Sequence, residues 1–133
     1  MSEAIALAVN GTLMQGLELN QNLLNVGATF VREAKTEPTY RLFSIDDIHP
    51  AMMRVQEGGK AISLEVWAVP PAGLAQILLQ EPPGLCIGKV RLSDGTEVLG
   101  VVGEAICCQS GKEITQYGGW RNYIANQSTA NQI

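Results

Sequence analysis

The sequence predicts an α+β domain that is mostly β, in the form of a small mixed or antiparallel β-barrel with a few short helices. Two observations lead to this prediction. Short apolar runs alternate with turn signals through most of the first half of the chain, a pattern typical of strands joined by tight connections. Helical patterns are confined to two short stretches. A barrel is preferred to an open sheet because closure removes exposed strand edges.

The first half of the chain is predicted to be sheet, followed by a short helix. The expected strands cover residues 5–9, 28–33, 40–45, 52–55 and 61–69. Prolines at 70–71 suit the opening of a helix, where the missing N–H costs nothing. An i, i+3, i+4 spacing then defines one apolar helical face, made by Leu74, Ile77 and Leu78. The helix should stop at Glu81, because the residue before a proline is pushed toward extended geometry.

The second half is predicted to hold a hairpin and one more helix. Strands are expected over residues 86–92 and 97–102, and the Asp-Gly step between them is a strong hairpin signal. A second helix is predicted over residues 120–125. The polar, uncharged ending "NQSTANQI" is expected to be a frayed tail. The chain therefore divides into one domain over residues 1–125 and a tail over 126–133.

Length and charge exclude several classes of function. A chain of 133 residues suits one domain with a real core. Its 9 basic and 13 acidic residues leave a net charge of −4, without a basic run that would contact nucleic acid. The N-terminus lacks a signal-peptide pattern, and no apolar run approaches the roughly 18 residues that span a membrane. We expect a cytoplasmic protein that binds neither nucleic acid nor membrane.

Metal and cofactor sites are not expected. The three cysteines, Cys86, Cys107 and Cys108, form neither an even disulfide framework nor a paired metal-ligand spacing. They are expected to be buried free thiols. His49 is the only histidine, and the chain has no Cys-x-x-Cys pair, so a zinc site is improbable. The residues imply no cofactor of any other kind.

The stretch "IALAVNGTLMQG" raises the first functional question. An apolar run enters Asn10, Gly11 and Thr12, and apolar character resumes at Leu13. A glycine turn after a buried strand can simply reverse the chain. Alternatively, it can direct several backbone N–H groups at a negatively charged ligand.

Glu81 is the second candidate, because it lies near a helix C-terminus, where the helix dipole disfavours negative charge by roughly 0.3–1 kcal/mol. One interpretation is an exposed carboxylate at a helix end. The other is a buried carboxyl group, whose pKa desolvation would raise until it could donate or accept a proton near neutral pH.

Two further motifs contain polar residues that suit a site. His49 follows two acids in "SIDDIHPAMMRV", and their carboxylates would favour its protonated form. In "QYGGWRNY", the planar fork of Arg121 suits a ligand carboxylate, and Tyr117 offers a hydroxyl. The structural alternative is that His49 belongs to a turn, that Trp120 and Tyr123 anchor the last helix, and that Arg121 pairs with a surface acid.

Four motifs together carry a resemblance to a known family. In chain order they are "NGTLMQG", "YRLFSIDDIHPAMMRVQEGG", "EPPG" and "YGGWRNY". Their order and spacing resemble the C-terminal domain of allophanate hydrolase over about residues 5–125. That domain belongs to the γ-glutamylcyclotransferase-like superfamily, so the resemblance implies a small β-barrel with a pocket beside the loop that follows the first strand.

The resemblance also implies roles for individual residues. The loop from Asn10 to Leu13 would hold the substrate through backbone N–H groups, and Glu81 matches the acid/base glutamate of the superfamily. Cyclotransferases open this loop with Tyr, whereas Asn10 resembles the allophanate hydrolase branch. That branch implies decarboxylation of N-carboxycarbamate, or acid/base chemistry on a related small carboxylate or amide. His49 would then bind the substrate carboxylate.

Two functions of different classes stay open, and so does whether the chain is an enzyme. The 133 residues cannot hold the amidase half of allophanate hydrolase. The chain is therefore either a small decarboxylase, lyase or cyclotransferase-like enzyme, or a non-catalytic module that binds a ligand, a separate amidase or a second copy of itself. A buried Glu81 directed at the loop favours the enzyme. An exposed Glu81, or a pocket filled by Met14 or Met52, favours the module.

Overall fold

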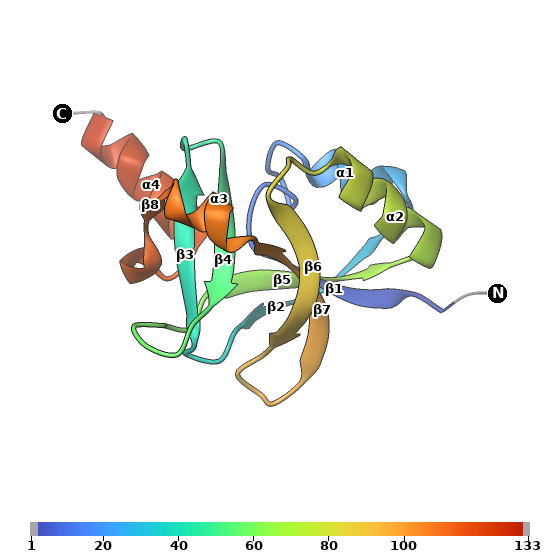
Figure 1. Cartoon of the computed structure of the whole chain (residues 1–133). Helices are drawn as coiled ribbons and strands as arrows, with labels where there is room; N and C mark the ends of the chain where they lie inside the picture. The colour runs from blue at the N-terminus through green and yellow to red at the C-terminus, as the bar shows by residue number, and fades with distance from the viewer. Residues whose placement is uncertain (1–2, 132–133) are drawn as a thin grey trace.

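The mostly β, α+β class is confirmed by the computed structural model, which describes residues 3–131 and the side chains up to residue 127 (Figure 1). A five-stranded sheet has the order β2-β5-β1-β7-β6. β1 pairs antiparallel with β5 and parallel with β7, so the sheet is mixed. Its strands are β1 (Ile5–Val9), β2 (Thr29–Lys35), β5 (Ser63–Val69), β6 (Leu85–Arg91) and β7 (Glu97–Gly103).

This sheet curls but does not close into the expected barrel. Its edge strands, β2 and β6, meet only where their chains continue past the strand ends. There Thr36 and Leu92 form a single antiparallel bridge, flanked by a 2.8 Å bond from Ser93 N–H to the Lys35 carbonyl. The ladder cannot continue, because Pro38 has no N–H to donate and the chain turns away into the next sheet.

A smaller three-stranded sheet, of order β4-β3-β8, lies beside the first (Figure 1). Its strands are β3 (Tyr40–Ile45), β4 (His49–Arg54) and β8 (Lys112–Glu113). Three residues, 46–48, join β3 to β4, and the central turn residues Asp46 and Asp47 have positive φ values of 55° and 57°, as in a type I′ turn. Because the turn is this short, β4 begins at His49, earlier than the predicted start at residue 52.

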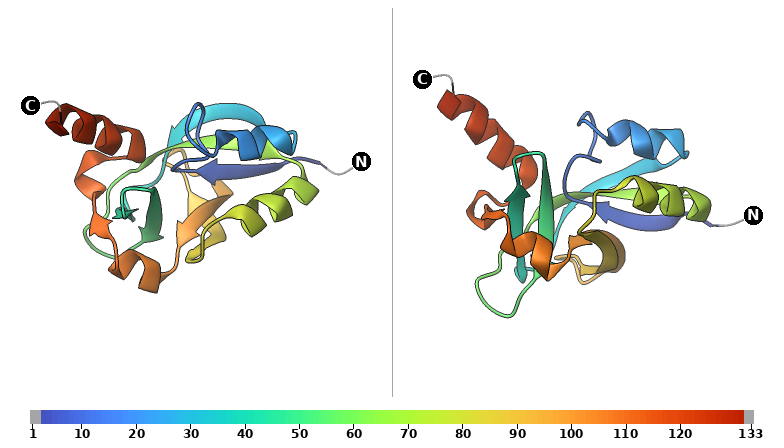
Figure 2. Two further views of the ribbon diagram at one scale, coloured as in Figure 1. Left: turned by 90° about the horizontal axis from the view of Figure 1, so that it is seen from above. Right: turned by 45° about the horizontal axis from the view of Figure 1, so that its top comes forward.

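The helices lie outside the curled sheet, with α1 (Asn20–Asn25) and α2 (Pro71–Gln80) side by side (Figures 1 and 2). α2 opens on Pro71 and ends one residue before Glu81, as predicted. Of its apolar residues, Ile77 is buried, whereas Leu78 is 37% exposed. The sequence did not predict four other short elements, namely α1, α3 (Ala105–Gln109), the 3₁₀ helix η1 (Thr115–Tyr117) and β8.

The last helix, α4, is longer than expected. It covers Trp120–Asn131, so residues 126–131 are helical and not a frayed tail, while 132–133 fall outside the described residues. The amide side chains support the extra turns, since Asn126 Nδ2 donates to the Asn122 carbonyl at 2.7 Å. Trp120 and Tyr123 are each 1% exposed and anchor the start of this helix in the core.

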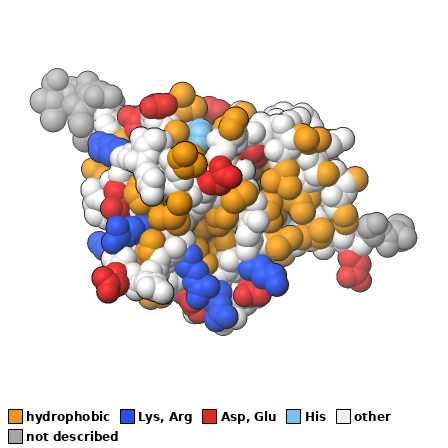
Figure 3. Space-filling model, viewed as in Figure 1, with side chains coloured by type: hydrophobic (Ala, Val, Ile, Leu, Met, Phe, Trp, Pro, Cys, Tyr) orange, Lys and Arg blue, Asp and Glu red, His pale blue; other side chains and the backbone are white. Residues whose placement is uncertain are grey.

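The surface has an uneven distribution of apolar groups. Figure 3 shows hydrophobic side chains gathered over the side of the molecule that carries α2 and β6. Exposed apolar residues of this side include Leu78 and Leu79 of α2. No helix among residues 3–131 is long and apolar enough to cross a membrane.

Candidate functional site

A small cavity of about 20 Å³ brings together the loop after β1, the start of β4 and the end of α2. Its lining comprises Val9, Asn10, Gly11, Thr12, Leu13, His49, Pro50, Glu81, Leu85 and Val101. The structure therefore places Glu81, His49 and the whole Asn10–Leu13 loop at one site. Neither Met14 nor Met52 lines this cavity, so neither fills it.

Among the described residues, the carbonyl groups of Gly11, Thr12 and Leu13 are hydrogen-bonded, whereas the N–H groups of the same three residues are free. The Gly11 carbonyl accepts from Met14 N–H at 3.0 Å, the Thr12 carbonyl from Leu19 N–H at 2.9 Å, and the Leu13 carbonyl from Asn20 Nδ2 at 2.8 Å. Within residues 3–131, the N–H groups of Gly11, Thr12 and Leu13 have no acceptor. Buried backbone donors are nearly always paired, so this loop suits an anionic ligand as acceptor.

Asn10 acts on the loop's position through its side chain. It is 4% exposed, and its Nδ2 donates to the Val101 carbonyl of β7 at 2.9 Å. Its side-chain amide nitrogen is thus used within the protein, which leaves the substrate-binding role predicted for the loop to the backbone N–H groups. The bond ties the first residue of the loop to the adjacent parallel strand.

Gly11 lies against the ring of Pro50. A Cβ added at Gly11 would lie 2.5 Å from Pro50 Cδ and 2.6 Å from Pro50 Cγ. We expect Gly11→Ala to lower the free energy of unfolding by about 1–3 kcal/mol, because the stiff proline ring cannot move aside without shifting β4. Urea denaturation measures this change.

The Pro50→Ala background provides the control for that prediction. Without the ring carbons, the added methyl group has space, so Gly11→Ala should cost less in Pro50→Ala than in the natural chain. An equal cost in both backgrounds would show that Pro50 is not the reason for glycine at position 11.

Glu81 lies at the cavity as a half-buried carboxyl group. It caps α2 with extended backbone, at φ −73° and ψ 150°. Burial raises the pKa of its carboxyl from 4.5 to about 7, as the burial hypothesis required. None of the ion pairs formed within the described part of the chain includes it. Near neutral pH the group is therefore divided between its protonated and ionised forms, which suits proton transfer.

In the part of the chain that the structure describes, His49 has one ring nitrogen without a hydrogen-bond partner. Its Nδ1 lies 3.0 Å from the Pro50 carbonyl oxygen. A carbonyl oxygen only accepts, so Nδ1 carries a hydrogen in this contact, and Nε2 is the nitrogen left for a ligand. Protonation of Nε2 would make His49 a second donor toward an anion in the cavity.

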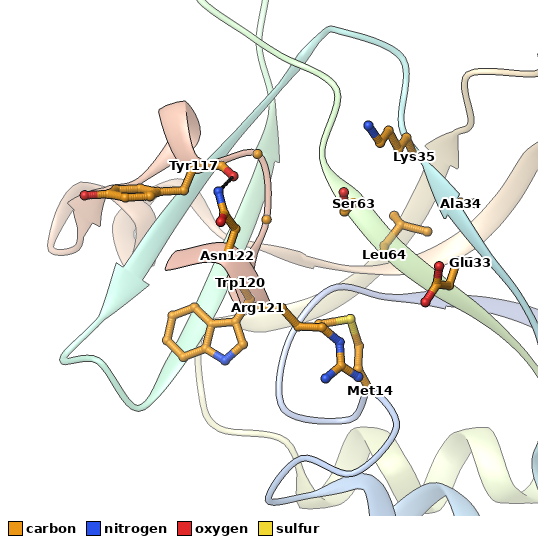
Figure 4. Close-up of a pocket in the computed structure, with 12 residues that line it drawn as sticks. Met14, Glu33, Ala34, Lys35, Ser63, Leu64, Tyr117, Trp120, Arg121 and Asn122 are labelled. Atoms are coloured by element: carbon orange, nitrogen blue, oxygen red, sulfur yellow. Dashed lines mark hydrogen bonds between the residues drawn. The ribbon is translucent and has the colours of Figure 1, made fainter. Parts of the chain in front are cut away.

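Tyr117 and Arg121 lie elsewhere, in a larger cavity of about 410 Å³ between β2, β5 and the start of α4 (Figure 4). They are not at the cavity of Glu81. Figure 4 shows their side chains pointing in different directions, with Arg121 directed toward Met14. Tyr117 instead packs its ring on Tyr123, at 5.2 Å between centroids.

Arg121 pairs with a buried acid that the sequence reasoning missed. Its Nη2 lies 3.0 Å from Glu65 Oε2, and Glu65 is 2% exposed. Arg121 therefore pairs with an acid, as the structural alternative to substrate binding predicted, but this acid is buried and not on the surface. The sequence did contain one indication of a buried acid, because Glu65 is the single acidic residue in the apolar strand "SLEVWAV".

The three cysteines are free, as expected, and only Cys108 is fully buried. Burial raises the pKa of the Cys108 thiol to about 11, so it is neutral at physiological pH. No group of His, Cys, Asp and Glu side chains in the described residues is placed to hold a metal ion.

Comparisons with known proteins identify the family of the chain and its fold. The family model described as "Allophanate hydrolase C-terminal domain" matches residues 5–125. A urea amidolyase from Saccharomyces cerevisiae is 35% identical over 134 residues, which cover 92% of this chain. The chain spans only 7% of the length of that relative.

Solved structures show the same fold. The uropathogenic E. coli protein c4763 has a TM-score of 0.91 and 51% identity, over 94% of this chain and 98% of its own. The Kluyveromyces lactis allophanate hydrolase has a TM-score of 0.87 and 32% identity, over 92% of this chain and 21% of its own. An AIG2-like mouse protein shares the fold alone, with a TM-score of 0.59 and 18% identity over 79% of this chain and 78% of its own.

Proposed function

The chain belongs to the allophanate hydrolase C-terminal domain family, and from this premise we propose that it performs acid/base chemistry on a small carboxylate. The reaction proposed first is the decarboxylation of N-carboxycarbamate. One observation carries the proposal: a carboxyl group with a pKa of about 7 shares a cavity with a loop whose backbone N–H groups have no acceptor within residues 3–131.

The residues divide the reaction between binding and proton transfer. The N–H groups of the Gly11–Leu13 segment are donors for carboxylate oxygens, and Nε2 of His49 is a further polar group for the substrate in the same cavity. Protonated Glu81 supplies a hydrogen to the substrate nitrogen. As the bond between that nitrogen and the departing carboxylate carbon breaks, its electron pair stays on nitrogen, which takes the proton. The products are carbamate and CO₂, and Glu81 regains its proton from water.

The cavity also limits what can bind. A volume of about 20 Å³ admits one small group, so a carboxylate enters while the rest of the ligand stays at the mouth. Apolar side chains of Val9, Leu13, Leu85 and Val101 line the same space. An apolar environment raises the free energy of a charged carboxylate more than that of neutral CO₂. The cavity therefore favours release of CO₂ from the ionised substrate.

The test uses ¹³C-labelled allophanate and a separate amidase that lacks its own C-terminal domain. The amidase generates N-carboxycarbamate, whose decay is followed by ¹³C NMR with and without this chain. We expect the chain to accelerate the decay by about 10²-fold or more. Decay at the same rate with and without the chain would exclude the decarboxylase.

The second candidate is a module that partners a separate amidase. It is favoured by the length of the relatives, since the matching domain is one part of a far longer chain in urea amidolyase. In that case this chain would bind the amidase and change the rate at which ammonia is released from allophanate, while the decay of N-carboxycarbamate stays unchanged.

A further inference from the structure

A buried carboxylate lies next to the loop of the candidate site. Glu65 of β5 is 2% exposed, and its register partner is Val9, the last residue before the loop. Its Oε1 accepts from Gln15 N–H at 2.9 Å and from Trp67 Nε1 at 3.1 Å, and its Oε2 accepts from Arg121 at 3.0 Å. The other ion pairs among residues 3–131 join two partly exposed side chains, whereas this pair has one buried member, Glu65.

Arg121 also contacts Gln15 directly. The Arg121 Nη2 that pairs with Glu65 also donates to the Gln15 carbonyl at 2.6 Å. Both backbone groups of Gln15 are therefore held, its N–H by Glu65 and its carbonyl by Arg121. Gln15 itself is exposed and lies outside any helix or strand, so regular structure does not fix its position.

Gln15 is two residues beyond Leu13, where the loop leaves the cavity. The loop enters at Asn10, which is tied to the Val101 carbonyl at 2.9 Å. Just past its exit the chain is held at Gln15, which is tied to Glu65 and Arg121. Hydrogen bonds to charged groups are stronger than neutral ones, so the second attachment restrains the loop strongly.

We propose that Arg121 and Glu65 are positioning residues for the Asn10–Leu13 loop: through Gln15 they fix the direction of its free N–H groups. The restraint itself is a property of the fold, and only its effect on the reaction rests on the proposed function. Neither side chain lines the cavity of Glu81, so neither is a catalytic residue.

Hydrogen exchange measured by mass spectrometry on the whole chain tests the restraint. In Arg121→Ala, the peptide over residues 10–16 should exchange about tenfold faster or more, while the β3–β4 hairpin over residues 40–54 keeps its natural rate. The matched control is Arg32→Ala, which removes an exposed pair with Asp94 of 3.1 Å and should leave residues 10–16 unchanged.

Arg121→Lys keeps the test valid if the alanine variant does not fold. Lysine retains a positive charge for buried Glu65, but its side chain is one bond shorter than that of arginine, so its Nζ cannot take the position from which Nη2 contacts both Glu65 and Gln15. Exchange should therefore accelerate several-fold at residues 10–16 alone. Unchanged exchange there, or equal acceleration along the whole chain, would overturn the positioning role.

The catalytic consequence is measured separately in the N-carboxycarbamate assay. Arg121→Lys should raise KM more than it lowers kcat, since it disturbs the binding loop and leaves Glu81 in place. Local acceleration of exchange without any turnover in the natural chain would retain the positioning role and reject the decarboxylase. Turnover with unchanged exchange in the variant would do the reverse.

Discussion

Turnover of N-carboxycarbamate by Glu81→Gln is expected to fall by about two orders of magnitude or more, the usual contribution of a positioned acid or base. Glutamine keeps the size and shape of the side chain but cannot release a proton to the substrate nitrogen. The loop donors and His49 are unchanged, so the variant should still bind a small carboxylate, which calorimetry with malonate measures. The fall in turnover should therefore appear as a lower kcat, with ligand binding unchanged.

The matched control for this prediction is Glu97→Gln. Glu97 lies at the start of β7 and pairs with Arg91 at the surface, with 46% of its side chain exposed. Its replacement removes one carboxylate without changing the cavity, and turnover should stay at the natural rate. If Glu81→Gln kept that rate as well, Glu81 could not be the proton donor.

The second large effect is on stability, and it requires no substrate. The folded pKa of Glu81, about 7, lies above its ordinary 4.5, so the folded protein holds this proton more tightly than the unfolded chain. Glu81 therefore lowers stability progressively as pH rises from about 4.5 to 7, by up to about 3 kcal/mol above pH 7. Glutamine carries no charge, so Glu81→Gln should be more stable than the natural chain at pH 8.

Urea denaturation at pH 5 and pH 8 measures this effect as a difference between the two proteins. Other titrating groups contribute equally to both and cancel. The gain from Glu81→Gln should approach 3 kcal/mol at pH 8 and be small at pH 5. A Glu81→Gln gain of the same size at both pH values would mean that burial does not raise the Glu81 pKa.

Local pattern predicted much of the backbone. The strand over residues 40–45 has its predicted bounds, and so does the strand over 5–9. The Asp-Gly hairpin and the helix between the proline pairs are also confirmed. These elements depend on alternating apolar residues, turn chemistry and proline, all of which act over a few neighbouring residues.

Elements without a strong local pattern escaped prediction. α1 and α3 have six and five residues, too short to be stable without tertiary contacts. α1, for example, is tied to the loop by the bond from Asn20 to the Leu13 carbonyl. The prediction of a closed barrel was wrong because β2 and β6 do not pair along their length. Whether these edge strands meet depends on how strongly the whole sheet curls, which is also a matter of tertiary packing.

The sequence alone predicted the polar residues that line the cavity of Glu81. Local patterns or the family resemblance indicated the Asn10–Leu13 loop, His49 and the Glu81 carboxyl, which lies between a helix and two prolines. Only the tertiary structure decided the place of Arg121. Its partners, Gln15 and Glu65, are 106 and 56 residues away in the chain. A side chain's periodicity tells which face it occupies, but its partners across the core depend on how whole elements pack, which no local pattern records.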